Sequence, residues 1–135
     1  MQAIQLQNES IVEIATFLVR RWSEEDKMIV EISDKMETKT RLNEKKVIMT
    51  PLEKRIGDDF QKYRQFRTSL WYEAMRVKFC KKILSNDHAF GFILNTMETQ
   101  KVEQLGRKIW KGMDNEIIFN YAYMLVARPQ LNSVY

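Results

Sequence analysis

The first fifty residues contain neither proline nor glycine: the first proline is Pro51 and the first glycine is Gly57. These two residue types are the strongest local interruptions of regular structure. Within this uninterrupted stretch, apolar residues recur at the spacing of one helix face, at Ile11, Ile14, Ala15, Leu18 and Trp22. Ser10, followed three residues later by Glu13, has the pattern of a capping box. The stretch therefore predicts an amphipathic helix.

The same periodicity continues past this helix. Ser23 and Asp26 repeat the capping pattern and predict a restart or a kink, after which Met28, Ile29, Ile32 and Met36 continue the apolar face. Residues 38–46 are polar and charged, which fits either a solvated helix end or a loop. Val47, Ile48 and Met49 could form a short strand, but the sequence offers no obvious partner for it.

Further helices are predicted after Pro51. Thr50-Pro51-Leu52-Glu53 is a helix start signal, and that helix could run towards Leu84 unless Gly57 interrupts it. Another helix should follow residues 85–87 and stop at Gly106, and a last helix should open at Asp114 or Asn115. We therefore expect an all-α fold: one helical domain over residues 1–135, a compact bundle or array of about five helices with little or no β structure.

Positive charge is concentrated in residues 61–82, which carry seven Lys or Arg residues and one acid, a net charge of +6, whereas the whole chain carries +4. The same stretch holds five aromatic residues. On a helical wheel its apolar residues form a core face: Tyr63, Phe66, Leu70, Ala74, Val77 and Leu84. A second stripe beside that face carries the cations and an indole: Arg64, Arg67, Trp71, Met75, Lys78 and Lys82.

The second stripe predicts a surface for an anionic partner, formed by Arg64, Arg67, Trp71, Lys78 and Lys82. Cations along one helix edge can neutralise phosphates, and an exposed indole can stack on an unpaired base. Single-stranded nucleic acid or an acidic protein would fit this combination. The same pattern also fits a structural role, in which Trp71 widens the core and acids among residues 1–60 pair with the helix inside the fold.

The sequence carries no catalytic, cofactor or metal-binding motif. His88 is the only histidine, and it follows Asp87 as a residue in the first helical turn follows a capping aspartate. Cys80 is the only cysteine and lies beside the core face. No glycine-rich phosphate loop and no metal-ligand spacing occurs. We therefore expect a protein that is not an enzyme and that uses no cofactor.

Composition and length suggest where such a protein acts. A single cysteine, no apolar run of membrane-spanning length and no signal-peptide pattern at the start predict a cytoplasmic protein that does not enter membranes. The main hypothesis is a small accessory protein that binds through residues 61–82. The alternative is a helical assembly subunit that self-associates, which an exposed apolar strip on residues 11–36 would support.

Overall fold

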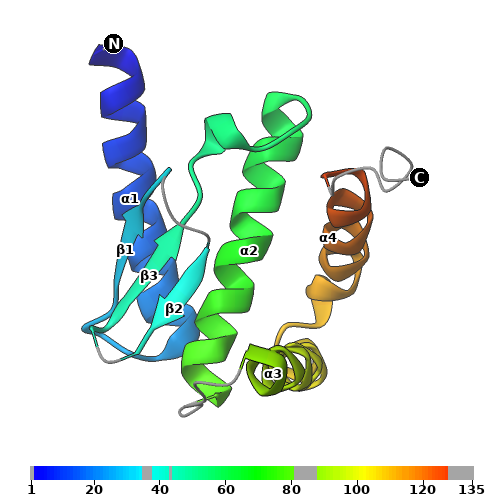
Figure 1. Ribbon diagram of the computed structural model, residues 1–135. Helices are drawn as coiled ribbons and strands as arrows, with labels where there is room; N and C mark the ends of the chain where they lie inside the picture. The colour runs from blue at the N-terminus through cyan, green and yellow to red at the C-terminus, as the bar shows by residue number, and fades with distance from the viewer. Residues whose placement is uncertain (1, 35–37, 43, 81–87, 128–135) are drawn as a thin grey trace.

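The computed structural model describes residues 2–34, 38–42, 44–80 and 88–127 of the chain (Figure 1). In chain order its elements are α1 (Gln2–Ser23), β1 (Ile29–Ile32), β2 (Lys39–Arg41), β3 (Lys46–Met49), η1 (Leu52–Lys54), α2 (Asp59–Phe79), α3 (His88–Ile109), η2 (Lys111–Met113) and α4 (Asp114–Ala127). Helix α2 lies in the middle, with α1 and a small sheet on one side and α3 and α4 on the other (Figure 1).

The three-stranded sheet shows that the all-α expectation is wrong. Strand β3 is central: it pairs in parallel with β1 and antiparallel with β2, so the strand order is β1-β3-β2. The helix expected to continue to residue 36 ends at Ser23, and Glu24 has a left-handed φ of 60°. Residues of β1 then alternate between exposed and buried around Val30. That two-residue alternation is typical of a strand with one covered face.

The short strand considered for Val47–Met49 does form. Its partners are β1 and β2, two segments whose local sequence patterns did not indicate strands. All three of its apolar residues are buried, as expected for a central strand covered on both faces. Its neighbour β1 carries Ile29 and Ile32, which we had assigned to a helix face. A short apolar run satisfies both periodicities, so the backbone pairing decided between them.

The start of α2 also differs from the prediction. Thr50 and Pro51 precede only the short 3₁₀ turn η1, and α2 begins at Asp59. Gly57 has a φ of 98°, a conformation that interrupts a helix and that glycine adopts without strain. Asp58 caps α2: its carboxylate accepts from the Gln61 backbone N–H at 2.8 Å, and the Gln61 side chain accepts from the Asp58 backbone. This is a complete capping box.

The hydrophobic core surrounds α2. The predicted core positions Phe66, Leu70, Ala74 and Val77 are confirmed as buried, whereas Tyr63 is partly exposed and Leu84 lies outside the described residues. Trp71 and Met75, placed on the neighbouring stripe, are buried as well. Side chains from every main layer meet them, including Val19 of α1, Val47 and Met49 of β3, Val102 of α3 and Ile117 of α4.

Two further boundaries complete the comparison. Helix α3 does not stop at Gly106 but continues to Ile109, and α4 opens at Asp114 as predicted. Over the residues described, none of the helices combines the length and the apolar character needed to cross a bilayer.

Candidate functional site

Trp71 belongs to the interior of the protein. It is 1% exposed and its ring meets Tyr72 edge-on, with centroids 5.3 Å apart. The expectation that this indole faces solvent among the cations is therefore wrong. The reason is that α2 is covered on several sides, so the stripe next to the predicted core face is also buried. A buried ring offers no surface on which a base could stack.

Arg64 and Arg67 do lie together, and both reach Glu116 at the start of α4. Arg64 donates from Nε to Glu116 Oε2 at 2.9 Å and from Nη2 to Oε1 at 3.0 Å, and its guanidinium lies 4.2 Å from the Phe119 ring centroid. Arg67 Nη2 lies 3.4 Å from Glu116 Oε2. The hydrogen bond from Arg64 holds the pKa of Glu116 below its usual value. Two cations therefore share one carboxylate.

The remaining predicted cations are not part of that group. Lys78 pairs with Glu24, which follows α1, at 3.1 Å. Lys82 lies outside the described residues. Another cation of the same helix, Arg76, donates to Glu98 of α3 at 3.1 Å.

Most of the described positive charge on α2 is thus paired within the fold. The carboxylate partners come from α3, from α4 and from Glu24, which follows α1, whereas the alternative structural interpretation placed them among residues 1–60. Of that earlier group only Glu24 takes part in these pairs among the described residues. The local net charge of residues 61–82 therefore overstates the positive potential of the folded helix.

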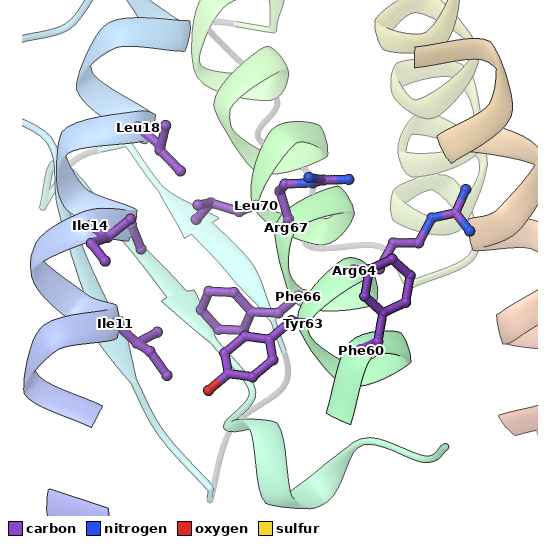
Figure 2. Close-up of a pocket in the computed structure, with 10 residues that line it drawn as sticks. Ile11, Ile14, Leu18, Phe60, Tyr63, Arg64, Phe66, Arg67 and Leu70 are labelled. Atoms are coloured by element: carbon purple, nitrogen blue, oxygen red, sulfur yellow. The ribbon is translucent and has the colours of Figure 1, made fainter. Parts of the chain in front are cut away.

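An apolar groove runs between α1 and α2, and Arg64 and Arg67 of α2 lie beside it (Figure 2). Its volume is about 280 Å³. Figure 2 shows Ile11, Ile14 and Leu18 of α1 directed towards Tyr63, Phe66 and Leu70 of α2. The other lining residues are Ala15, Phe60, Arg64 and Arg67.

The groove is open to solvent along apolar side chains. Ile14 is 61% exposed and Phe60 is 74% exposed, and Tyr63 is also exposed. Isolated exposed apolar residues are normal, but a contiguous apolar hollow is typical of an interaction site. Sequence reasoning assigned Ile11, Ile14 and Leu18 to one apolar helix face and did not single out Phe60. The periodicity identifies an apolar face correctly, but it does not say whether a neighbouring element covers all of it.

The groove walls follow the repeat of helical side chains. The α1 wall consists of residues at three- and four-residue spacing, Ile11, Ile14, Ala15 and Leu18, and carries no charge. Among the described side chains, the charged residues that line the groove are Arg64 and Arg67, whose guanidinium groups extend from α2 away from α1 (Figure 2). The guanidinium groups therefore lie beyond the α2 side of the groove, and Arg67 retains 59% of its side-chain exposure.

Potential metal ligands are dispersed over the described part of the chain. They contain no group of three or more His, Cys, Asp or Glu side chains arranged to hold a metal ion. Cys80 is buried, and burial raises the pKa of its thiol, which disfavours the reactive thiolate. The side chains of Asp87 and His88 lie outside the described part of the chain.

Comparison with protein-family models, with curated proteins and with solved structures gives no significant match. Inference about function therefore depends on the groove, its charges and the packing of the chain itself.

Proposed function

We propose that this protein is a non-catalytic accessory protein that binds an acidic amphipathic helix of another protein in the groove between α1 and α2. The observation that carries the proposal is the continuous apolar groove with Ile14 and Phe60 exposed along it. Recognition of this kind places the apolar face of a helix into a groove, with anchors at i, i+3 or i+4 and i+7.

The charge of the groove supports an acidic partner. Among the described side chains, its charged lining residues are Arg64 and Arg67, and Glu116 provides a single carboxylate for both. A carboxylate of a bound helix can pair with the exposed Arg67 without breaking the bidentate Arg64–Glu116 contact. Such rim pairs contribute to orientation and association rate more than to affinity.

A protein partner is better supported than single-stranded nucleic acid. Recognition of unpaired bases depends on aromatic stacking surfaces combined with a basic groove. Trp71 is buried, and Arg64, Arg76 and Lys78 are paired with carboxylates. Apolar side chains of a protein partner can be buried in the apolar groove, whereas a phosphate backbone would make no favourable contact with its walls.

The test is a fluorescence anisotropy titration with a labelled peptide of about four helical turns. The peptide carries Leu at the helical anchor positions and Glu on the opposite face, and its control is a scrambled peptide of equal composition. We expect saturable binding of the amphipathic peptide and much weaker binding of the scrambled one. Ile14→Glu should weaken binding at least about tenfold, because it places a charge in the apolar groove.

Ile118→Glu is the matched control, since Ile118 of α4 is 67% exposed and does not line the groove. It should bind as the unchanged protein does. Equal binding of both peptides, or equal losses in the two variants, would contradict the proposal. Salt-sensitive binding of a single-stranded oligonucleotide that competes with the peptide would favour a nucleic-acid partner instead.

Self-association is the second candidate, and one observation favours it. Ile14, Phe17 and Ile29 are exposed apolar side chains within residues 11–36, where this hypothesis places an apolar strip. Light scattering over a concentration series tests this candidate: an oligomer lost in Phe17→Glu would support it, and a monomer at high concentration would exclude it.

With either partner we propose a cytoplasmic location, which fits the buried free thiol of Cys80.

A further inference from the structure

A second cavity lies on the side of α2 that faces α3 and α4. Its volume is about 370 Å³, within the range of small-molecule sites. Its α2 wall is a polar stripe at helical spacing, formed by Gln65, Ser69, Tyr72 and Arg76. Helix α3 contributes Glu103, and α4 contributes Asn120. This cavity is separate from the apolar groove and shares no lining residue with it.

Two side chains of this wall are buried with polar atoms that lack partners. Gln65 and Tyr72 are each 7% exposed. Gln65 Nε2 donates to Ser69 at 2.8 Å and to Asn120 Oδ1 at 3.3 Å, but Gln65 Oε1 accepts no hydrogen bond from the described residues. The Tyr72 hydroxyl lies beside the Glu103 carboxylate, and burial together with this carboxylate raises the pKa of Tyr72, but the two groups do not meet with the geometry of a good hydrogen bond. Buried polar groups of native proteins are normally satisfied, so these two atoms require an explanation.

The cavity also holds two groups of opposite charge, Arg55 and Glu103, that form no ion pair within 4 Å among the described residues, although Glu103 also interacts electrostatically with the Arg107 guanidinium. Arg55 has no carboxylate within 4 Å among the described residues, and its buried Nε has no acceptor there, although its Nη2 donates to the Thr50 carbonyl at 2.9 Å. Glu103 accepts a hydrogen bond from Tyr121, but no Lys or Arg nitrogen of the described residues lies within 4 Å of it. Burial lowers the pKa of Arg55 to about 10, so it remains a cation at neutral pH.

The other charged groups at this cavity are already paired. Arg76 donates to Glu98 at 3.1 Å and to Thr99 at 2.8 Å. Glu73 accepts from the Thr40 hydroxyl and faces Arg76. The unmatched groups are therefore one cation, one carboxylate, the Gln65 amide oxygen and the Tyr72 hydroxyl.

We propose that this cavity binds a small zwitterion that carries one ammonium group and one carboxylate, the chemistry of a free amino acid. The ammonium supplies hydrogen-bond donors for Glu103 and for the Tyr72 hydroxyl. The carboxylate accepts from the Arg55 guanidinium, the pairing that this group's planar donors favour. Such a ligand offers a partner to both protein charges, whereas a simple cation or anion would leave one of the two unmatched.

The spacing of these groups suits a ligand a few bonds long. Gln65 and Tyr72 are seven residues apart on one helix face, which corresponds to roughly 10 Å along the axis. Side chains from both ends reach into this span, and the volume of the cavity accommodates a ligand of amino-acid size. Amino acids with the ammonium and carboxylate on one carbon, and those with the two groups further apart, are both members of the class.

The experiment is an NMR titration of the full chain at millimolar concentrations of each common α-amino acid and of 4-aminobutanoic acid. At least one of them should give saturable shifts at residues lining the cavity. For the tightest binder, the methyl ester, which lacks the carboxylate, and the N-acetyl derivative, which lacks the ammonium, should each bind at least about tenfold more weakly. Failure of all of these zwitterions to bind, or unchanged binding of the ester and acetyl derivatives, would overturn the proposal.

Variants locate the site. Glu103→Gln keeps the shape of the side chain and removes its charge, and it should weaken binding at least about tenfold. Glu53→Gln, an exposed change outside the cavity, should leave binding unchanged. Thermal unfolding of each variant establishes that it is folded. Full-strength binding by a folded Glu103→Gln protein would rule out the assignment, whatever the result of the groove experiment.

Discussion

Gly106 of α3 lies directly against the indole of Trp71 in α2. A Cβ atom at position 106 would be 2.5 Å from Trp71 Cζ2 and 2.7 Å from Cη2. The glycine, which we had interpreted as a helix stop, is instead the contact that lets α3 approach the largest side chain in the core.

Gly106→Ala should therefore destabilise the protein. Alanine favours a helix by up to about 1 kcal/mol over glycine, but overpacking a rigid buried ring typically costs about 1–3 kcal/mol. We expect a net loss in the free energy of unfolding, measured by urea denaturation. Gly112→Ala is the control, because no atom lies within 4 Å of its Cβ position. A stabilising Gly106→Ala change would contradict this packing.

Trp71→Ala should act on stability rather than on a binding surface. Removal of a buried tryptophan leaves a cavity and commonly costs about 3–5 kcal/mol. Arg67→Ala, at an exposed position on the same helix, should change the free energy of unfolding by less than about 1 kcal/mol. Denaturant unfolding of the two variants checks this difference. A Trp71→Ala protein of unchanged stability would mean that the indole is not in the core.

The burial of Glu73 should make stability decrease as the pH rises. Desolvation raises the pKa of this carboxyl above its usual 4.5, so between 4.5 and the raised value the folded state binds more protons than the unfolded state. The contribution of Glu73 to stability is greatest below pH 4.5 and is lost as the pH rises through the folded-state pKa. Glu73→Gln should flatten this decline in a series of unfolding measurements from acid to neutral pH. An unchanged slope in the variant would show that other groups cause it.

The Arg64–Glu116 pair should show the opposite pH dependence. Arg64 holds the pKa of Glu116 below 4.5, so this pair stabilises the fold fully above pH 4.5 and is lost as the pH falls through the lowered value. A double-mutant cycle with Arg64→Gln and Glu116→Gln at neutral pH should give a coupling free energy of about 0.5–1 kcal/mol. The coupling should disappear in strong acid. A coupling of zero at neutral pH would mean that the two hydrogen bonds do not form in solution.

Sequence patterns predicted local features with partial success. The helical character of residues 11–22, the buried positions Phe66, Leu70, Ala74 and Val77, and the opening of the last helix at Asp114 were predicted correctly. These features depend on side-chain periodicity and helix caps within a few turns. The capping pattern at Ser10 did not mark a helix start, because α1 begins at Gln2. The sheet was missed because the pairing of Val30 with Val47 joins segments far apart in the sequence.

The candidate sites depended still more on long-range contacts. The concentration of cations in residues 61–82 is a property of the chain alone, but their charges are offset by Glu98 and Glu116 from helices that follow. The sequence analysis did not single out the polar stripe of Gln65, Ser69, Tyr72 and Arg76, because only the approach of α3 and α4 makes it the wall of a cavity.

The sequence by itself determined which segments favour helix and which faces of those helices are apolar, because these properties arise from neighbours along the chain. Only the tertiary structure decided which apolar faces are covered, which cations are paired and which polar groups are buried without partners. Trp71 illustrates the difference: its place on the helix was known from its position in the chain, but its burial results from the approach of Gly106 in another helix.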